Sequence, residues 1–203
     1  MIFPKNKKLK REFYNRTFLT VAKDLLGKIL VVKKGKYFLA ARIVEVEAYH
    51  EESDEASHAF KGKTNRNAVM FGEGGHLYVY FTYGAHFCAN IVVGKKGKGI
   101  AVLIRAVEPL EGIYVMLKNR YGKKSVEDKS LFNLTSGPGK VCHALGINLN
   151  HNGIDLVGNE IFILDQPKLK NKEIGVSSRI GITRSVDLQW RFFIIGNPFI
   201  SRK

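Results

Sequence analysis

The chain has few cysteines and no long apolar run, and these two absences argue against a disulfide-rich protein and a membrane-spanning protein. Cys88 and Cys142 are the only cysteines among 203 residues, too few for a disulfide framework or a cysteine-based zinc cluster. No apolar stretch approaches the roughly 18–20 residues that span a bilayer, and the first residues lack the apolar core of a signal peptide. We therefore expect a cytoplasmic, intracellular protein with no membrane partner, in which both cysteines are buried thiols.

Acidic residues are also scarce, and they are unevenly placed. Eighteen Asp and Glu stand against 33 Lys and Arg, a formal net charge of +15, and this surplus favours binding to a polyanion such as nucleic acid. Six of the eighteen acids fall within residues 45–55. A surface that only binds phosphate groups does not require a cluster of carboxylates, which would repel them. The pattern therefore favours an enzyme that acts on nucleic acid, with a merely basic surface as the plain alternative.

The order of apolar runs predicts an α+β fold. No repeat or linker interrupts the chain, which predicts one domain over residues 1–203, with residues 1–12 as a flexible basic terminus. Helical spacing appears in three segments that end at glycines, namely 18–26, 113–121 and 138–145. Strand patterns appear in 29–49 (two strands), 76–84, 86–93, 99–112, 161–164, 180–183 and 190–195, whereas 61–75 and 123–133 are predicted loops. Strands dominate without a β-α-β rhythm, so we expect a mainly antiparallel sheet.

Two carboxylates share one face of a predicted strand. Because side chains alternate along a strand, Glu45, Glu47 and Tyr49 lie on one face, and Val44 with the other intervening apolar residues faces the core. Strands with a solvent face often carry Glu. Alternation alone therefore leaves the two carboxylates equivalent and leaves a purely structural interpretation open.

Isolated polar residues in apolar strands add to this pattern. Asn90 and Arg105 each interrupt an otherwise apolar run, and such residues are costly to bury without partners. Glu47 is a natural partner for Arg105, either as part of a site or as a structural ion pair. His58 directly follows the acidic stretch, although a lone His is more often not catalytic. The acids lack a recognised ligand spacing, so no metal is expected, with a metal site as the minority alternative.

Aromatic residues cluster in one predicted hairpin. Residues 77–84 contain three Tyr and one Phe, most of which we expect in the core. Tyr83 differs because it stands beside Gly84 at the predicted bend and projects outward. On a basic protein, such a ring is suited to insertion between base pairs.

Seven segments together resemble the alkyladenine (3-methyladenine) DNA glycosylase family. They follow in order over nearly the whole chain: EVEAY (45–49), DEASH (54–58), TNRN-x-x-MF (64–71), LYVYFTYG (77–84), CAN (88–90), LIRAVEPLEG (103–112) and SGPGK (136–140). The resemblance implies a single domain with a curved antiparallel sheet, flanking helices and a protruding hairpin that docks in the DNA minor groove. It also implies that the damaged base is flipped out of the duplex.

The resemblance further assigns roles to individual residues. Glu47 matches the general base and Arg105 the residue that holds the carboxylate and water. The remaining matches are to residues of the base pocket (Tyr49, His58, Tyr80, Met70 and the gatekeeper Asn90), to the intercalating wedge (Tyr83) and to positions near DNA (Thr64 and Arg66).

These features predict a monofunctional glycosylase that hydrolyses the N-glycosidic bond of alkylated or deaminated purines in double-stranded DNA. Glu47 is a candidate general base, and no residue is an equally good candidate for the general acid. This arrangement suits cationic nucleobases, which leave without being protonated. No lysine is placed as a nucleophile, so we expect an abasic site without strand cleavage, no cofactor, and a monomer. A metal-dependent nuclease and a non-catalytic nucleic-acid-binding module remain as alternatives.

Overall fold

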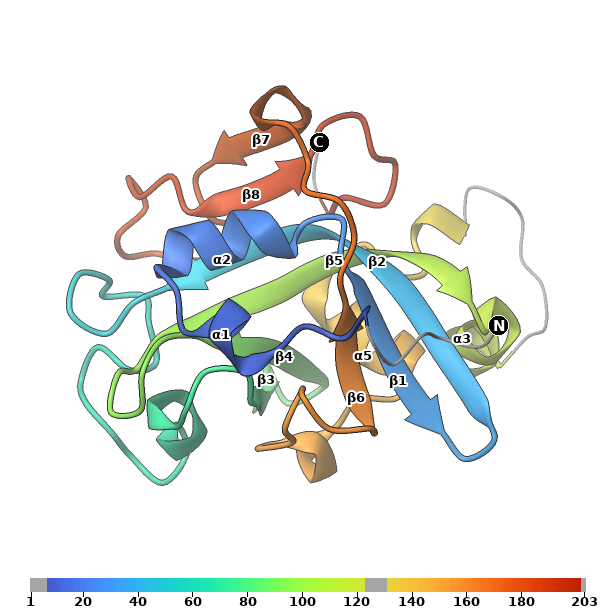
Figure 1. Ribbon diagram of the computed structural model, residues 1–203, viewed down its shortest axis with the longest axis horizontal. Coiled ribbons are helices and arrows are strands. Elements are labelled where there is room, and N and C mark those ends of the chain that lie inside the picture. The colour runs from blue at the N-terminus through green and yellow to red at the C-terminus, as the bar shows by residue number, and fades with distance from the viewer. Residues whose placement is uncertain (1–6, 123–130, 202–203) are drawn as a thin grey trace.

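The computed structural model describes residues 7–122 and 131–201 (Figure 1). Residues 1–6 of the predicted flexible terminus and residues 123–130 of a predicted loop lie outside the described residues. Residues 7–12 of the predicted terminus are packed against the rest of the fold. Leu9 is buried, and its backbone N–H donates to Ile163 O at 2.8 Å. The short helix α1 (Arg11–Tyr14) follows directly.

An antiparallel sheet forms the centre of the molecule. Its strand order is β3-β4-β5-β2-β1-β6, and β8 adds to β2 and pairs with β7. The bounds are β1 (Ile29–Lys34), β2 (Tyr37–Tyr49), β3 (Leu77–Thr82), β4 (His86–Val92), β5 (Ala101–Glu111), β6 (Ile161–Leu164), β7 (Ile174–Ser177) and β8 (Arg191–Ile194). The predicted α+β fold class, a single domain with a mainly antiparallel sheet, is confirmed.

The long strand β2 causes the sheet to curl. One edge of β2 pairs with β5, whereas its other edge pairs first with β1 (residues 37–42) and then with β8 (residues 45–47). Because two partners share this edge, β7 and β8 lie above the main sheet, away from β1 and β6 (Figure 1). Glu45 and Glu47 lie where β2 is flanked by β5 and β8.

Two helices close the hydrophobic core. The apolar sides of α2 (Phe18–Leu25) and α5 (Pro138–Leu145) belong to the same buried cluster as the central strands. α5 begins at Pro138, a favoured first helical position, and ends at Gly146 with φ 71°, as the sequence predicts. The third predicted helix, α3 (Ile113–Tyr121), packs beside α5. Cys88 and Cys142 are buried free thiols.

Two local predictions are wrong, and one strand was not predicted. Residues 180–183 are not a strand but part of a loop, whereas β7 forms at Ile174–Ser177, a segment without a strong apolar pattern. Val44 does not share the face of Val46. The pairing of β2 with β5 shifts register on both sides of Glu45, and Val44 packs with Phe199 instead of the main core. A β-bulge breaks strict alternation in this way.

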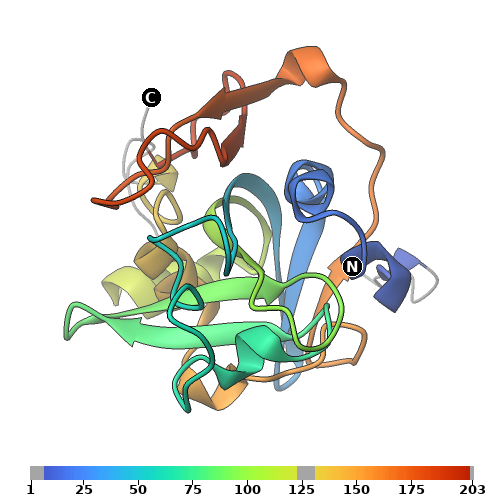
Figure 2. The ribbon, with the colours of Figure 1, turned by 90° about the vertical axis from the view of Figure 1, so that its left-hand side faces the viewer.

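The β3–β4 hairpin projects from the sheet (Figure 2). Tyr83 and Gly84 at its turn have φ of 51° and 63°, and Ala85 N donates to Thr82 O at 3.2 Å. Two consecutive positive φ values are the pattern of a type I′ turn, whose twist matches that of the strands. Gly84 adopts this conformation freely, whereas a bulky Tyr seldom does.

No helix in the described ranges has both the length and the apolar character needed to cross a bilayer.

Candidate active site

A cavity of about 560 Å³ lies between the β3–β4 hairpin and the loop that follows β7. Seven of the predicted site residues line it: Tyr49, His58, Met70, Tyr80, Tyr83, Asn90 and Arg105. They come from β2, β3, β4, β5, the turn of the hairpin, and the turn and short 3-10 helix (Ala68–Phe71) between β2 and β3. The curled sheet therefore brings residues that are distant in sequence to one concave surface.

Glu47 lies directly behind the cavity wall. Its side chain has no exposed surface, and its carboxylate accepts three hydrogen bonds from residues that line the cavity. Tyr49 OH and Arg105 Nη1 donate to Oε2 at 2.9 and 3.3 Å, and Ile180 N donates to Oε1 at 2.7 Å. Among the described residues Ile180 is the one donor to Oε1, which leaves room for a second donor on that oxygen.

Tyr49 is held in the form that donates to this carboxylate. Burial, reinforced by the nearby negative charge of Glu47, raises the pKa of Tyr49 well above its usual value. The phenol therefore stays protonated at neutral pH and donates its hydrogen bond to Glu47. A neutral donor of this kind fixes the carboxylate without neutralising its charge.

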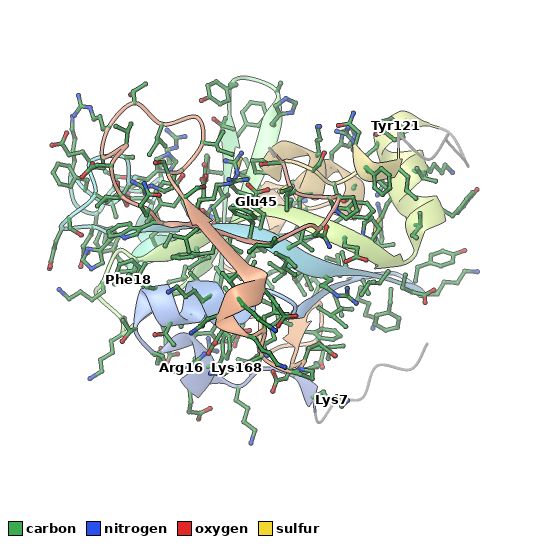
Figure 3. All side chains as sticks on the ribbon, turned by 90° about the horizontal axis from the view of Figure 1, so that it is seen from above. Lys7, Arg16, Phe18, Glu45, Tyr121 and Lys168 are labelled. Carbon is green, nitrogen blue, oxygen red and sulfur yellow. The ribbon has the colours of Figure 1, made fainter. Side chains whose placement is uncertain are left out.

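Glu45 is equally buried and shares Arg105 with Glu47, but its other partners differ. Its Oε1 accepts from Arg105 Nε, Arg191 Nε and Ser201 Oγ at 3.1, 2.7 and 2.8 Å, and its Oε2 accepts from Ser201 N. In Figure 3 Glu45 lies at the centre of the molecule, where β2 passes the C-terminal segments. Two of its three partners, Arg191 and Ser201, thus come from the C-terminal part of the chain, and Glu45 does not line the cavity.

Arg105 connects the two carboxylates because of the bulge. Between the pairs Glu45↔Ala106 and Val46↔Ile104, Arg105 is the extra residue on β5. An extra residue at a bulge changes the direction of its side chain. The guanidinium thereby reaches Glu45 with Nε and Glu47 with Nη1, and the predicted pairing of Arg105 with Glu47 is present in the structure.

Aromatic rings form one wall of the cavity. His58 contacts Tyr80 with ring centroids 4.5 Å apart, and its Nδ1 lies 3.1 Å from Tyr78 OH. Tyr78 packs against Tyr80 at 5.5 Å. Desolvation of His58 by this packing, together with the positive charge of Arg66, lowers the pKa of the imidazole below 6.5. His58 is therefore neutral at pH 7.

Asn90 and Met70 lie in the deeper part of the cavity surface. Both are buried and line the cavity. Asn90 Nδ2 donates to Tyr78 O at 3.2 Å, which satisfies one amide donor and orients the side chain. This contact is the polar partner that a buried Asn on an apolar strand requires.

Tyr83 stands at the rim with 87% of its surface exposed. Positive φ at a bulky residue is strained, and such strain is found at functional positions. The remaining predicted residues lie outside the cavity lining. Arg66 donates to Phe81 O at 3.4 Å and lies over the Tyr80 ring at 5.8 Å. Thr64 exchanges hydrogen bonds with Asn67, which in turn binds the backbone of His58.

The sequence reasoning missed the wall formed by Ile180–Arg184. The apolar residues of this segment predict a strand. Its main contribution to the site is the backbone N–H of Ile180, a group that every residue except proline carries. The reasoning also missed Tyr78, Cys88 and the buried pair Arg179–Asp54 behind this wall. Asp54 lies in the acidic stretch, and nothing in the sequence distinguishes it, as a buried carboxylate, from its exposed neighbours.

Known proteins are similar in sequence to this chain along almost its full length. The family model for methylpurine-DNA glycosylase matches residues 12–198. Proteins named "Putative 3-methyladenine DNA glycosylase" from Alkaliphilus oremlandii and Carboxydothermus hydrogenoformans are 51% and 47% identical. The two alignments cover 97% and 96% of this chain and 100% and 99% of the relatives. A third protein of that name, from Clostridium perfringens, is 43% identical over 97% of this chain and all of its own length.

The matched range includes both carboxylates, the aromatic wall, the hairpin and the 180–184 loop. Membership of this family makes the protein a DNA repair enzyme that hydrolyses N-glycosyl bonds, and it decides against the nuclease and the non-catalytic binding module. The chain belongs to the methylpurine-DNA glycosylase family.

Proposed function

We propose that this glycosylase flips a damaged purine from the minor-groove side of duplex DNA into the 560 Å³ cavity, where Glu47 activates the water that replaces the base. The observation that carries the proposal is the position of the Glu47 carboxylate. It lies behind an aromatic cavity, fixed by Tyr49, Arg105 and the Ile180 backbone. Ile180 N is the one described donor to Oε1, so a water that enters behind the cavity wall can give its proton to the second lone pair of this oxygen.

The reaction proceeds through a sugar with oxocarbenium character, as in glycoside hydrolysis. The Glu47 carboxylate takes a proton from water, the water oxygen bonds to C1′ of the sugar, and the base departs with the electrons of the glycosidic bond. The negative charge of Glu47 also stabilises the developing positive charge on the sugar. The product is an abasic site in an unbroken strand.

The substrates that suit this cavity are purines that are already good leaving groups. 3-Methyladenine and 7-methylguanine carry a positive charge in DNA and stack on electron-rich rings such as Tyr80 and Tyr49. His58 is neutral at pH 7 and does not repel them. Hypoxanthine and ethenoadenine belong to the proposed range as neutral, more slowly excised bases. Asn90 beside the base edge disfavours the exocyclic amine of normal guanine.

One assay tests the activity. A duplex with a single 7-methylguanine or hypoxanthine is incubated with the enzyme in excess EDTA, and half of the sample is then treated with alkali. We expect breaks at the lesion only after alkali, because the enzyme leaves an abasic site. Breaks before alkali, or a requirement for a divalent ion, would contradict metal-free hydrolysis. We expect the active species to be the monomer.

Tyr83→Ser is expected to weaken binding to lesion-containing duplex roughly tenfold, because a base–aromatic stacking contact contributes about 1–3 kcal/mol. The ring is exposed at the hairpin tip and is free to fill the gap that the flipped base leaves. Fluorescence anisotropy with lesion-containing and undamaged duplexes measures the effect. Equal losses for the two duplexes would remove the wedge role, and Tyr83→Phe serves as the control that keeps the ring.

Binding of a cationic lesion is expected to weaken as the pH falls through the pKa of His58, which lies below the usual value of 6.5. The lowered pKa keeps His58 neutral above this value, and protonation at lower pH places a positive charge beside the cationic base. The measurement is the ratio of affinities for 7-methylguanine and undamaged duplexes, so that general charge effects cancel. His58→Gln should abolish the pH dependence of this ratio, and a dependence that survives the substitution would assign it to another group.

A further inference from the structure

A buried ion pair lies behind the cavity, and neither partner touches the cavity surface. The side chains of Arg179 and Asp54 have no exposed surface. The pair is bidentate: Arg179 Nη1 donates to Asp54 Oδ2, and Nη2 donates to Oδ1 at 2.7 Å. The guanidinium also lies over the Tyr49 ring at 4.6 Å.

The ion pair joins two walls of the cavity. Arg179 Nη1 donates to Ala48 O at 3.0 Å, and Nη2 donates to Ser185 O at 3.3 Å, so the ends of the 179–185 loop are tied to β2. On the other side, Asp54 Oδ1 accepts from Ala56 N at 3.0 Å, at the start of the turn that carries His58. One contact thus sets the distance between the loop 180–184 and the aromatic wall.

The residue after Arg179 holds both members of the proposed catalytic pair. Ile180 N donates to Glu47 Oε1 at 2.7 Å, and Ile180 O accepts from Arg105 Nη1 at 3.3 Å. The N–H and the C=O of Ile180 belong to the two peptide units that flank its Cα, so their positions depend on the neighbouring residues of the chain. The neighbour that is anchored is Arg179.

We propose that Arg179 and Asp54 are positioning residues, which place the Ile180 peptide so that it aims Glu47 at the water. The inference rests on the proposed function of Glu47. It explains why a guanidinium occupies this place, because only its planar fork binds a carboxylate and two carbonyl oxygens at once.

Stability alone is a weaker reason for this pair. Two charges are removed from water, and Arg179 Nε has no hydrogen-bond partner among the described residues. Buried ion pairs with an unsatisfied donor contribute little net stability compared with apolar packing. Their geometric contribution is larger, because a displacement of about 1 Å in a catalytic site lowers the rate by about 10²-fold.

The test is the variant Arg179→Lys, which keeps the positive charge and loses the fork. We expect the single-turnover excision rate on a 7-methylguanine duplex to fall about 10–100-fold, with lesion affinity changed by less than about threefold. Saturating single-turnover rates report only the folded enzyme. Arg11→Lys is the matched control, because Arg11 also binds a carboxylate and a backbone carbonyl but lies outside the cavity. It should keep the wild-type rate.

The same substitution in a Glu47→Gln background shows whether Arg179 acts through Glu47. We expect the two effects to be non-additive, so that Arg179→Lys lowers the residual rate of Glu47→Gln by less than about threefold. A wild-type rate for Arg179→Lys, parallel losses of rate and affinity, or the same loss in both backgrounds would overturn the inference.

Asp54→Asn provides the second route to the same contact and keeps the side-chain size. It should show the same separation of rate from affinity, and it carries the test if Arg179→Lys does not fold. The two proposals fail separately. A Glu47→Gln enzyme with full activity refutes the proposed function, whereas an inactive Glu47→Gln beside a fully active Arg179→Lys refutes only the positioning role.

Discussion

Glu47→Gln is expected to lower the single-turnover excision rate by about 10²–10⁴-fold, the range that a general base contributes. Glutamine has the same shape, and its single oxygen keeps the hydrogen bond from Ile180 N when it occupies the position of Oε1. It does not accept a proton at neutral pH and does not offer a negative charge to the developing cationic sugar. The substitution therefore removes the activation of water, whereas the cavity that receives the base is unchanged.

Lesion affinity separates this explanation from a general loss of structure. We expect Glu47→Gln to bind a 7-methylguanine duplex within about threefold of the wild type, since removing an interaction made only in the transition state leaves ground-state binding intact. Quenched-flow or gel-based single-turnover assays give the rate, and anisotropy gives the affinity. Excision near the wild-type rate would show that another group activates the water.

Glu45→Gln is expected to act mainly on stability. Glu45 compensates two buried guanidinium groups, Arg105 and Arg191, and accepts hydrogen bonds from Ser201. Removing one partner of a buried ion pair costs roughly 3–5 kcal/mol of the free energy of unfolding, and Glu45→Gln removes the negative charge that faces both guanidinium groups. For a chain of this length that corresponds to a drop in Tm of about 6–20 °C.

Thermal unfolding followed by circular dichroism measures this effect, and Arg42→Gln is a suitable control. Arg42 lies on β2, as Glu45 does, and pairs with Glu108 of β5 at 3.0 Å, but its side chain is 43% exposed. An exposed pair contributes about 0–1 kcal/mol, so this variant should unfold close to the wild-type Tm. If Glu45→Gln has the same Tm as Arg42→Gln, the hydrogen-bond network around Glu45 does not stabilise the fold.

Much of the fold could be predicted because local patterns and the global fold agree. Continuous and alternating apolar runs locate the central strands, and glycines after α3 and α5 end those helices with positive φ. The errors arise where tertiary contacts override the pattern. Ile180 and its apolar neighbours form a cavity wall instead of a strand, and Val44 changes face at a bulge that no residue type in β2 announces.

The site was predictable where its chemistry needs unusual residue types. Asn90 and Arg105 interrupt apolar strands, and Tyr83 stands at a turn, so each is visible in the sequence. The distinction between Glu45 and Glu47 was not, because alternation places both on one face. Their partners, Ser201 for Glu45 and the Ile180 backbone for Glu47, come from distant parts of the chain. A backbone donor leaves no mark in composition or spacing.

The most direct test of the role of Glu47 compares Glu47→Gln and Glu45→Gln on one 7-methylguanine duplex at a temperature where both are folded. The ratio of single-turnover excision rate to lesion affinity is measured for each. We predict that this ratio falls by about 10² or more for Glu47→Gln and by less than about tenfold for Glu45→Gln. Equal ratios for the two variants, or a larger fall for Glu45→Gln, would contradict the assignment of Glu47 as the residue that activates water.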